Sequence, residues 1–120
     1  MATVLVIDDE RVIRDVIVEV LEDAGHDVLG VATAEEGVNR LDDDAFDLVV
    51  SDLLLPGLSG LDLLGEVRRR RPGVPVVFVT GAGMPIDGAS EARGFVAKPF
   101  SHAELREAVA TALQARKDAA

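Results

Sequence analysis

Side chains that could do chemistry stand at the ends of four short apolar runs in this sequence. They are Asp8 and Asp9 after residues 4–7, Asp52 after 48–51, Thr80 after 76–79, and Lys98 after 95–97. Short apolar runs between turn signals are typical of buried parallel strands, and ligands of open α/β sheets bind beyond the carboxyl ends of such strands. Three carboxylates close together need a cation, a shared proton or both. The pattern therefore predicts a metal-assisted phosphoryl site.

The segments that must position these residues alternate between strand and helix patterns. The predicted strands cover residues 3–8, 27–32, 47–52, 75–80 and 95–98. The predicted helices cover about 10–24, 34–44 and 60–71, and a last helix begins at Ser101. Such alternation predicts an α/β fold, a doubly wound five-stranded parallel sheet with strand order 2-1-3-4-5. Its switch point lies between strands one and three, where Asp8, Asp9 and Asp52 would meet.

Local signals mark the helix ends and the faces that the helices bury. The N-terminal caps have hydroxyl residues three positions before an acid: Thr33 with Glu36, Ser59 with Asp62, and Ser101 with Glu104. Gly25 suits the position after the first helix. The predicted buried stripes are Val12, Ile13, Val16, Ile17, Val20, Leu21 and Ala24 in the first helix, Leu61, Leu64 and Val67 in the third, and Leu105, Ala108, Val109, Ala112 and Leu113 in the last.

Length and charge limit the function classes. At 120 residues, with no repeat or linker, we expect one domain over residues 1–120 and no output domain in this chain. The net charge of −10 argues against nucleic-acid binding, and the basic run at 68–71 is read as a solvated helix end. No run of apolar residues is long enough to span a membrane, so a cytoplasmic protein is expected. His26 and His102 are interpreted as surface residues.

Four segments together resemble the receiver domains of bacterial two-component response regulators. They are residues 6–10 (Val-Ile-Asp-Asp-Glu), 52–60 (Asp-Leu-Leu-Leu-Pro-Gly-Leu-Ser-Gly), 79–81 (Val-Thr-Gly) and 98–100 (Lys-Pro-Phe). Each is weak alone, but the four follow successive predicted strands in order. The resemblance covers nearly the whole chain and implies a signalling switch that a sensor histidine kinase or a phosphotransfer domain phosphorylates. It implies a phosphoacceptor that assists its own reactions, not a multiple-turnover enzyme.

The resemblance also implies a role for each site residue. Asp52 would be the phosphoacceptor, Lys98 would pair with the phosphoryl group, and Thr80 would donate a hydrogen bond to it. Mg²⁺ (or Mn²⁺) would be held by Asp9, Asp52 and the backbone carbonyl of Leu54, with Asp8 acting mostly through a water. Mg²⁺ prefers a few carboxylates plus phosphate oxygens and keeps several waters, which suits this open cluster. The Lys98–Pro99 peptide bond is cis in such domains.

The segment between Thr80 and Lys98 departs from the family pattern. It is shorter than usual by roughly one helical turn, and Gly81, Gly83, Pro85 and Gly88 interrupt its first half. Only residues 89–93 remain as plausible helix, so we expect a shortened or irregular fourth helix.

Two single positions also bear on how such a switch would behave. Phe95 stands where family members more often have a tyrosine that moves with Thr80, and its interpretations as a switch residue and as a plain core residue stay equally open. Leu54 stands two positions after Asp52, and Ala82 two positions after Thr80. Neither side chain can orient a water, which predicts slow loss of a phosphoryl group.

Two other classes of protein stay open beside the signalling switch. One is a metal-dependent phosphatase with an aspartyl nucleophile on a related fold, although such enzymes place that nucleophile after the first strand in an Asp-x-Asp pattern and carry a lid. The other is an interaction module with a vestigial site, against which the intact set Asp8, Asp9, Asp52, Thr80 and Lys98 argues. Transfer of phosphate to the protein, turnover of phosphate esters, or neither would separate the three.

Overall fold

The computed structural model describes residues 2–81 and 92–119, with side chains up to residue 116. The described residues form a parallel sheet of order β2-β1-β3-β4-β5. Its strands are β1 (Thr3–Ile7), β2 (Asp27–Val31), β3 (Leu48–Asp52), β4 (Val76–Thr80) and β5 (Gly94–Ala97). The helices are α1 (Arg11–Asp23), α2 (Ala34–Asp43), α3 (Gly60–Arg70) and α4 (His102–Ala119). The predicted fold class, strand order and element positions are confirmed to within one or two residues at most ends.

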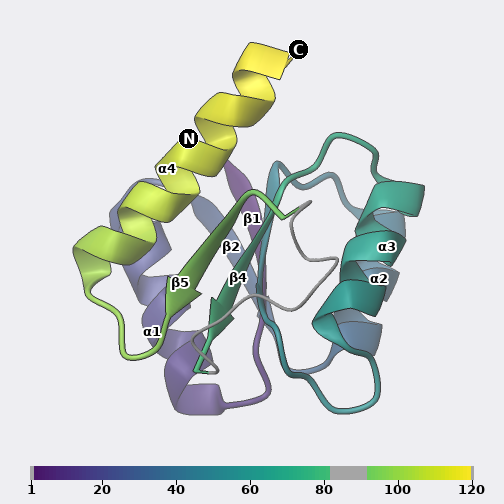
Figure 1. Cartoon of the computed structure of the whole chain (residues 1–120), viewed down its shortest axis with the longest axis horizontal. Helices are drawn as coiled ribbons and strands as arrows, with labels where there is room; N and C mark the ends of the chain where they lie inside the picture. Colours follow the sequence, from purple (N-terminus) through teal and green to yellow (C-terminus); the bar gives the residue numbers. More distant parts are fainter. Residues whose placement is uncertain (1, 82–91, 120) are drawn as a thin grey trace.

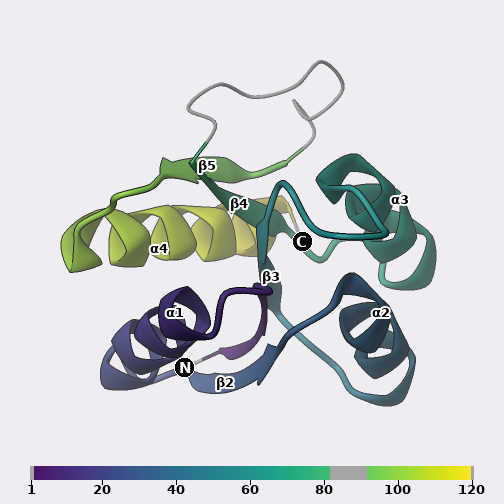
Figure 2. The ribbon, with the colours of Figure 1, turned by 90° about the horizontal axis from the view of Figure 1, so that it is seen from below.

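The sheet lies between two helical layers. Helices α1 and α4 cover one face, and α2 and α3 cover the other (Figures 1 and 2). Successive side chains of a strand point to opposite faces, so Leu5 and Ile7 pack in the cluster under α2 and α3, whereas Val4 and Val6 pack in the cluster under α1 and α4. Because both of their faces are buried, β1, β3 and β4 are largely apolar along their whole length, whereas the edge strands β2 and β5 are partly exposed.

Helix caps follow the sequence signals. The Oγ1 atom of Thr33 accepts the backbone N–H of Glu36 at 3.1 Å, and the Oγ atom of Ser59 accepts that of Asp62 at 3.2 Å. Ser101 and Glu104 complete a reciprocal capping box before α4, with hydrogen bonds of 3.0 and 3.1 Å.

Helix α1 ends in a Schellman motif. Gly25 has a φ of 95°, its N–H donates to the carbonyl of Glu22, and the N–H of His26 donates to that of Leu21. A glycine is favoured at this position because other L-residues rarely adopt a positive φ.

The predicted buried faces need two corrections. Val12 in the first turn of α1 is 74% exposed, and Ala24, the residue that follows the helix, is also exposed. In α3, Leu63 is fully buried and Leu61 only partly so, whereas Leu64 and Val67 are buried as predicted. Helix α3 packs against both β4 and α2, so its buried face is wider than one stripe. In α4, Leu105, Val109 and Ala112 are buried, and Ala108 and Leu113 are partly buried.

The basic run at the end of α3 is used within the fold. Arg70 forms ion pairs with Glu66 at 2.9 Å and with Asp42 of α2, and Arg69 also pairs with Glu66. Arg71 Nε donates to the carbonyl of Leu41 at 2.7 Å, near the C-terminus of α2. A cation there satisfies a helix-end carbonyl and suits the negative end of the helix dipole. Three of these four arginines therefore join α3 to itself or to α2, and the run is more than a solvated helix end.

The expected irregular fourth helix falls mostly on residues 82–91, which lie outside the described residues. Of the expected helical stretch, Ala92 and Arg93 are described, and both are bends that lead into β5. The N–H of Arg93 donates to the carbonyl of Val76 at 2.8 Å. Within residues 2–81 and 92–119, no helix is long and apolar enough to cross a membrane.

Candidate functional site

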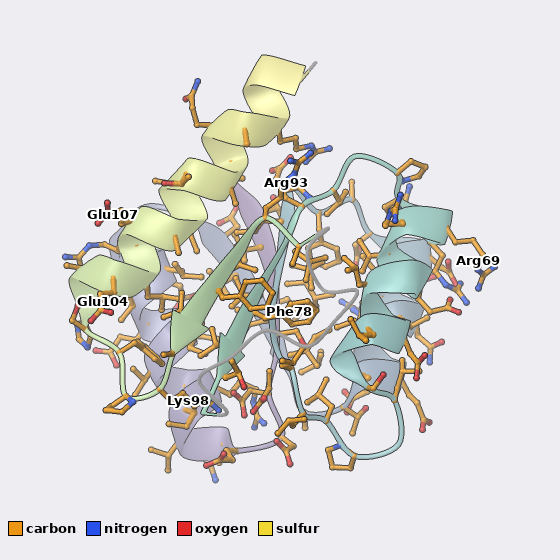
Figure 3. The ribbon with its side chains drawn as sticks, viewed as in Figure 1. Arg69, Phe78, Arg93, Lys98, Glu104 and Glu107 are labelled. Carbon is orange, nitrogen blue, oxygen red and sulfur yellow. The ribbon has the colours of Figure 1, made fainter. Side chains whose placement is uncertain are left out.

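The carboxyl ends of β1, β3 and β5 bring two carboxylates and one ammonium together. Lys98 Nζ lies 2.9 Å from Asp52 Oδ2 and 3.4 Å from Asp8 Oδ2. Asp8 is fully buried, Asp52 is 7% exposed, and the side chain of Lys98 is 16% exposed. Figure 3 shows Lys98 just beyond the end of β5, beside the start of α1. Asp8, Asp52 and Lys98, three of the strand-end residues that the sequence singled out, therefore meet at one edge of the sheet.

The two carboxylates are held in the same way. Asp52 Oδ1 accepts the N–H of Leu54 at 2.9 Å, and Asp8 Oδ1 accepts the N–H of Glu10 at 2.9 Å. Each aspartate thus uses one oxygen to fix the turn that follows its strand, as Asp commonly does. The other oxygen, Oδ2 in both cases, faces Lys98. This shared geometry fixes the orientation of both carboxylates.

Burial and the neighbouring charges shift the pKa values of Asp8 and Lys98. Burial raises the pKa of Asp8, and the hydrogen bond from Glu10 and the charge of Lys98 only partly oppose that shift. For Lys98, burial acts to lower the pKa, but the hydrogen bond to Asp52 and the charges of Asp8 and Asp52 outweigh it, so its pKa is raised. Lys98 therefore stays an ammonium ion, and the carboxylates around it carry an excess of negative charge.

A third carboxylate joins this cluster. Ligand oxygens of Asp8, Glu10 and Asp52 all lie within 4.8 Å of one another, a spacing that could hold a metal ion. This acidic cluster fits a Mg²⁺ site, because Mg²⁺ binds carboxylate oxygens and keeps waters between itself and some of them. Asp9 is exposed and does not belong to this group. Sequence reasoning missed Glu10, although it directly follows the acidic pair.

Thr80 and Phe95 lie where the topology predicts. Thr80 ends β4, is 3% exposed, and its carbonyl accepts the N–H of Lys98 at 2.9 Å. Phe95 in β5 is partly buried and stacks on Phe78 of β4, with ring centroids 5.8 Å apart. The Lys98–Pro99 bond is cis, as the resemblance implies.

The two histidines differ from each other. His102 is exposed, as predicted. His26 is partly buried, and its Nδ1 accepts the N–H of Ala2 at 3.1 Å, so its interpretation as an exposed loop residue is wrong. Its place in the turn after α1 brings it against the start of β1, which no local pattern shows.

The family model for the response regulator receiver domain matches residues 4–110. The chain belongs to this family. Response regulator protein FleR of Pseudomonas aeruginosa is 37% identical over 114 residues, which are 91% of this chain and 24% of FleR. Two-component response regulator PhoP of the same organism is 39% identical over 105 residues, 84% of this chain and 47% of PhoP. The chain thus spans less than half of either relative.

Solved proteins of this family share the fold over all or most of the chain. A response regulator receiver domain protein from Clostridium thermocellum has a TM-score of 0.89 and 31% identity, with 100% of both chains covered. Response regulator protein TrrA of Thermotoga maritima, solved in complex with Mg²⁺ and BeF, has a TM-score of 0.84 and 30% identity over 92% of this chain and 97% of TrrA. Receiver domains are signalling domains, and a phosphorylation switch is their general role.

Proposed function

We propose that Asp52 is the phosphoacceptor of this receiver domain and that its phosphorylation switches a partner-binding surface. The observation that carries the proposal is the 2.9 Å contact between Lys98 Nζ and the buried Asp52 Oδ2 at the carboxyl edge of the sheet. A carboxylate held by a backbone N–H on one oxygen and an ammonium on the other is preorganised for a reaction that adds negative charge beside it.

In the proposed reaction an oxygen of Asp52 attacks the phosphorus of a phosphohistidine. The O–P bond forms as the P–N bond breaks, and the electron pair leaves with the imidazole nitrogen, which takes a proton. The product is an acyl phosphate on Asp52. The donor would be a sensor histidine kinase or a phosphotransfer domain, and the protein would act stoichiometrically, not as an enzyme on external substrates. We place this exchange in the cytoplasm, where response regulators act.

The other site residues bind charge. We propose that Asp8, Asp9, Asp52 and the carbonyl of Leu54 hold Mg²⁺ (Mn²⁺ would substitute), which neutralises the charge that builds up on the phosphoryl oxygens. Support comes from the acidic cluster, to which Asp8 and Asp52 belong, and from TrrA, a relative solved with Mg²⁺ and BeF; Asp9 lies outside that cluster, and its part in the proposal rests on the family resemblance. Lys98 would pair with a phosphoryl oxygen, and the hydroxyl of Thr80 would donate a hydrogen bond to another.

The signal would leave through Thr80 and Phe95. The carbonyl of Thr80 accepts a hydrogen bond from the backbone N–H of Lys98. Phe95 lies on β5, three residues before Lys98, and its ring packs on that of Phe78. Movement of Thr80 toward a phosphoryl group would change the packing of this strand pair and so the surface that a downstream protein meets. Nucleic acid and membrane are not expected as direct partners, since the net charge is −10 and Arg69, Arg70 and Arg71 make contacts within the fold.

Phosphoryl transfer can be tested directly. The protein is incubated with Mg²⁺ and a small acyl or amido phosphate, and intact mass spectrometry follows a phosphate-sized increase. The increase should vanish in Asp52→Asn and with chelator, and persist in Asp27→Asn, a matched change at the opposite edge of the sheet. Steady hydrolysis of phosphate esters would support a phosphatase instead, and no modification with any donor would support a vestigial module.

A further inference from the structure

Glu10 has no role in the ligand set that the resemblance implies, yet it reaches the site. Its carboxylate oxygen lies 3.7 Å from Lys98 Nζ, and it belongs with Asp8 and Asp52 to the group whose ligand atoms lie within 4.8 Å of one another. Its side chain is 63% exposed, so it lies on the solvent side of the cluster, whereas Asp8 and Asp52 are buried.

The backbone of Glu10 is fixed by the same residues that form the site. Its N–H donates to Asp8 Oδ1 at 2.9 Å, and its carbonyl accepts the N–H of Arg14 in the first turn of α1. Glu10 is the N-cap residue of α1, but its side chain makes no capping hydrogen bond to the described backbone. The backbone of Glu10 is therefore fixed beside the site, and its carboxylate lies within ion-pair distance of Lys98.

The charges of these four groups do not balance. Three carboxylates surround one ammonium, which leaves two negative charges for a divalent cation to compensate. Mg²⁺ keeps several of its waters when it binds a few carboxylates, so a carboxylate on the solvent side of the cluster can act on the cation through a bound water. Glu10, the exposed member, is in the position to do so.

We propose that Glu10 is a positioning residue of the cation site, a further carboxylate that strengthens Mg²⁺ binding through a bound water. The proposal rests on the proposed function, which supplies the cation, and adds a residue to its site. An exposed charge about 5 Å from a divalent ion changes its affinity by about threefold to tenfold when solvent and salt screen it.

The test is a titration of the unphosphorylated protein with MgCl₂, followed by the amide NMR shift of Leu54 and by calorimetry. The chain has no Trp or Tyr, so fluorescence offers no probe. Three proteins are compared at one ionic strength: wild type, Glu10→Gln, and Glu19→Gln, which removes the same charge from the exposed face of the same helix. We expect Glu10→Gln to bind Mg²⁺ about threefold to tenfold more weakly, and Glu19→Gln to stay within about twofold of wild type.

Each other outcome contradicts a different statement. Equal affinity of Glu10→Gln and wild type would overturn the role of Glu10 and leave Asp52 and its cation untouched. Equal losses in both variants would also overturn it, since net charge alone would then explain the effect. Wild-type protein that binds no Mg²⁺ would refute this inference together with the cation site of the proposed function.

Discussion

Lys98 Nζ lies 2.9 Å from Oδ2 of Asp52, the oxygen that the N–H of Leu54 leaves available. The same ammonium is 3.4 Å from Oδ2 of Asp8. Breaking a buried ion pair by removing one partner is costly because the remaining charge stays desolvated. In the unphosphorylated protein the ammonium of Lys98 is therefore the counter-ion of Asp8 and Asp52, and a bound metal ion would contact the same two carboxylates.

This sharing predicts that Lys98→Met and Mg²⁺ act against each other. Without metal, the variant should lose on the order of 1–3 kcal/mol of unfolding free energy, because the buried carboxyl groups of Asp8 and Asp52 lose the ammonium that they contact. Mg²⁺ should then bind Lys98→Met more tightly than wild type and stabilise it more, since the stabilisation by a ligand rises with the logarithm of its affinity for the folded state. Urea unfolding with and without MgCl₂ measures both effects. Lys98→Arg, which keeps the charge, should behave like wild type; equal Mg²⁺ stabilisation of Lys98→Met and wild type would contradict the prediction.

The side chain of Leu54 should set the lifetime of the phosphoryl group. It is 61% exposed and follows Asp52 by two residues, with its N–H on the acceptor carboxylate. An apolar group there cannot hold a water for attack on the acyl phosphate, whereas Leu54→Asn supplies a donor and an acceptor. We expect the variant to lose phosphate several-fold faster, measured by intact mass after the donor is removed. Leu54→Met, of similar size and still apolar, should decay at the wild-type rate, and no acceleration in Leu54→Asn would exclude this role.

Gly37 and Gly65 make a matched pair for the packing of the helices. A Cβ atom on Gly37 of α2 would meet the side chain of Ile7, with Cγ1 at 2.9 Å, whereas one on Gly65 of α3 would meet nothing within 4 Å. Gly37→Ala should therefore destabilise the fold by about 1–3 kcal/mol through overpacking. Gly65→Ala should stabilise it by roughly 0.5–1 kcal/mol, because alanine is the better helix former. Chemical denaturation of the two variants measures whether each substitution raises or lowers the free energy of unfolding. A stabilising Gly37→Ala would contradict the prediction and show that the side chain of Ile7 can move aside.

Much of the site could be predicted because parallel strands end at one edge of a sheet. The polar residue after each buried run thus identified Asp8, Asp52, Thr80 and Lys98 without any coordinates. The orientation of neighbouring acids could not be predicted. Asp8 points inward, Asp9 outward, and Glu10 back to the cluster, and the turn held by Asp8 Oδ1 decides this.

The errors on the helices have a related cause. The spacing of apolar residues along a helix shows which of them share a face, but it does not show which other element packs against that face. Val12 is on the predicted stripe of α1 and yet lies beyond the sheet, with 74% of its surface exposed. Leu63 is off the predicted stripe of α3 and yet is buried, because α2 covers that side.

His26 should make stability depend on pH near neutrality. Its Nδ1 accepts the N–H of Ala2 at 3.1 Å, and burial lowers its pKa below the value in the unfolded chain, about 6.5. As pH falls, the unfolded state binds the proton first, so stability that is complete above about pH 6.5 is lost as pH falls through the pKa of folded His26. Urea midpoints between pH 7.5 and 5.5 should fall more steeply for wild type than for His26→Gln, which keeps an acceptor but does not titrate.

In His102→Gln protein the imidazole NMR signal belongs to His26 alone. A titration there at or above pH 6.5 would contradict the burial of its neutral form.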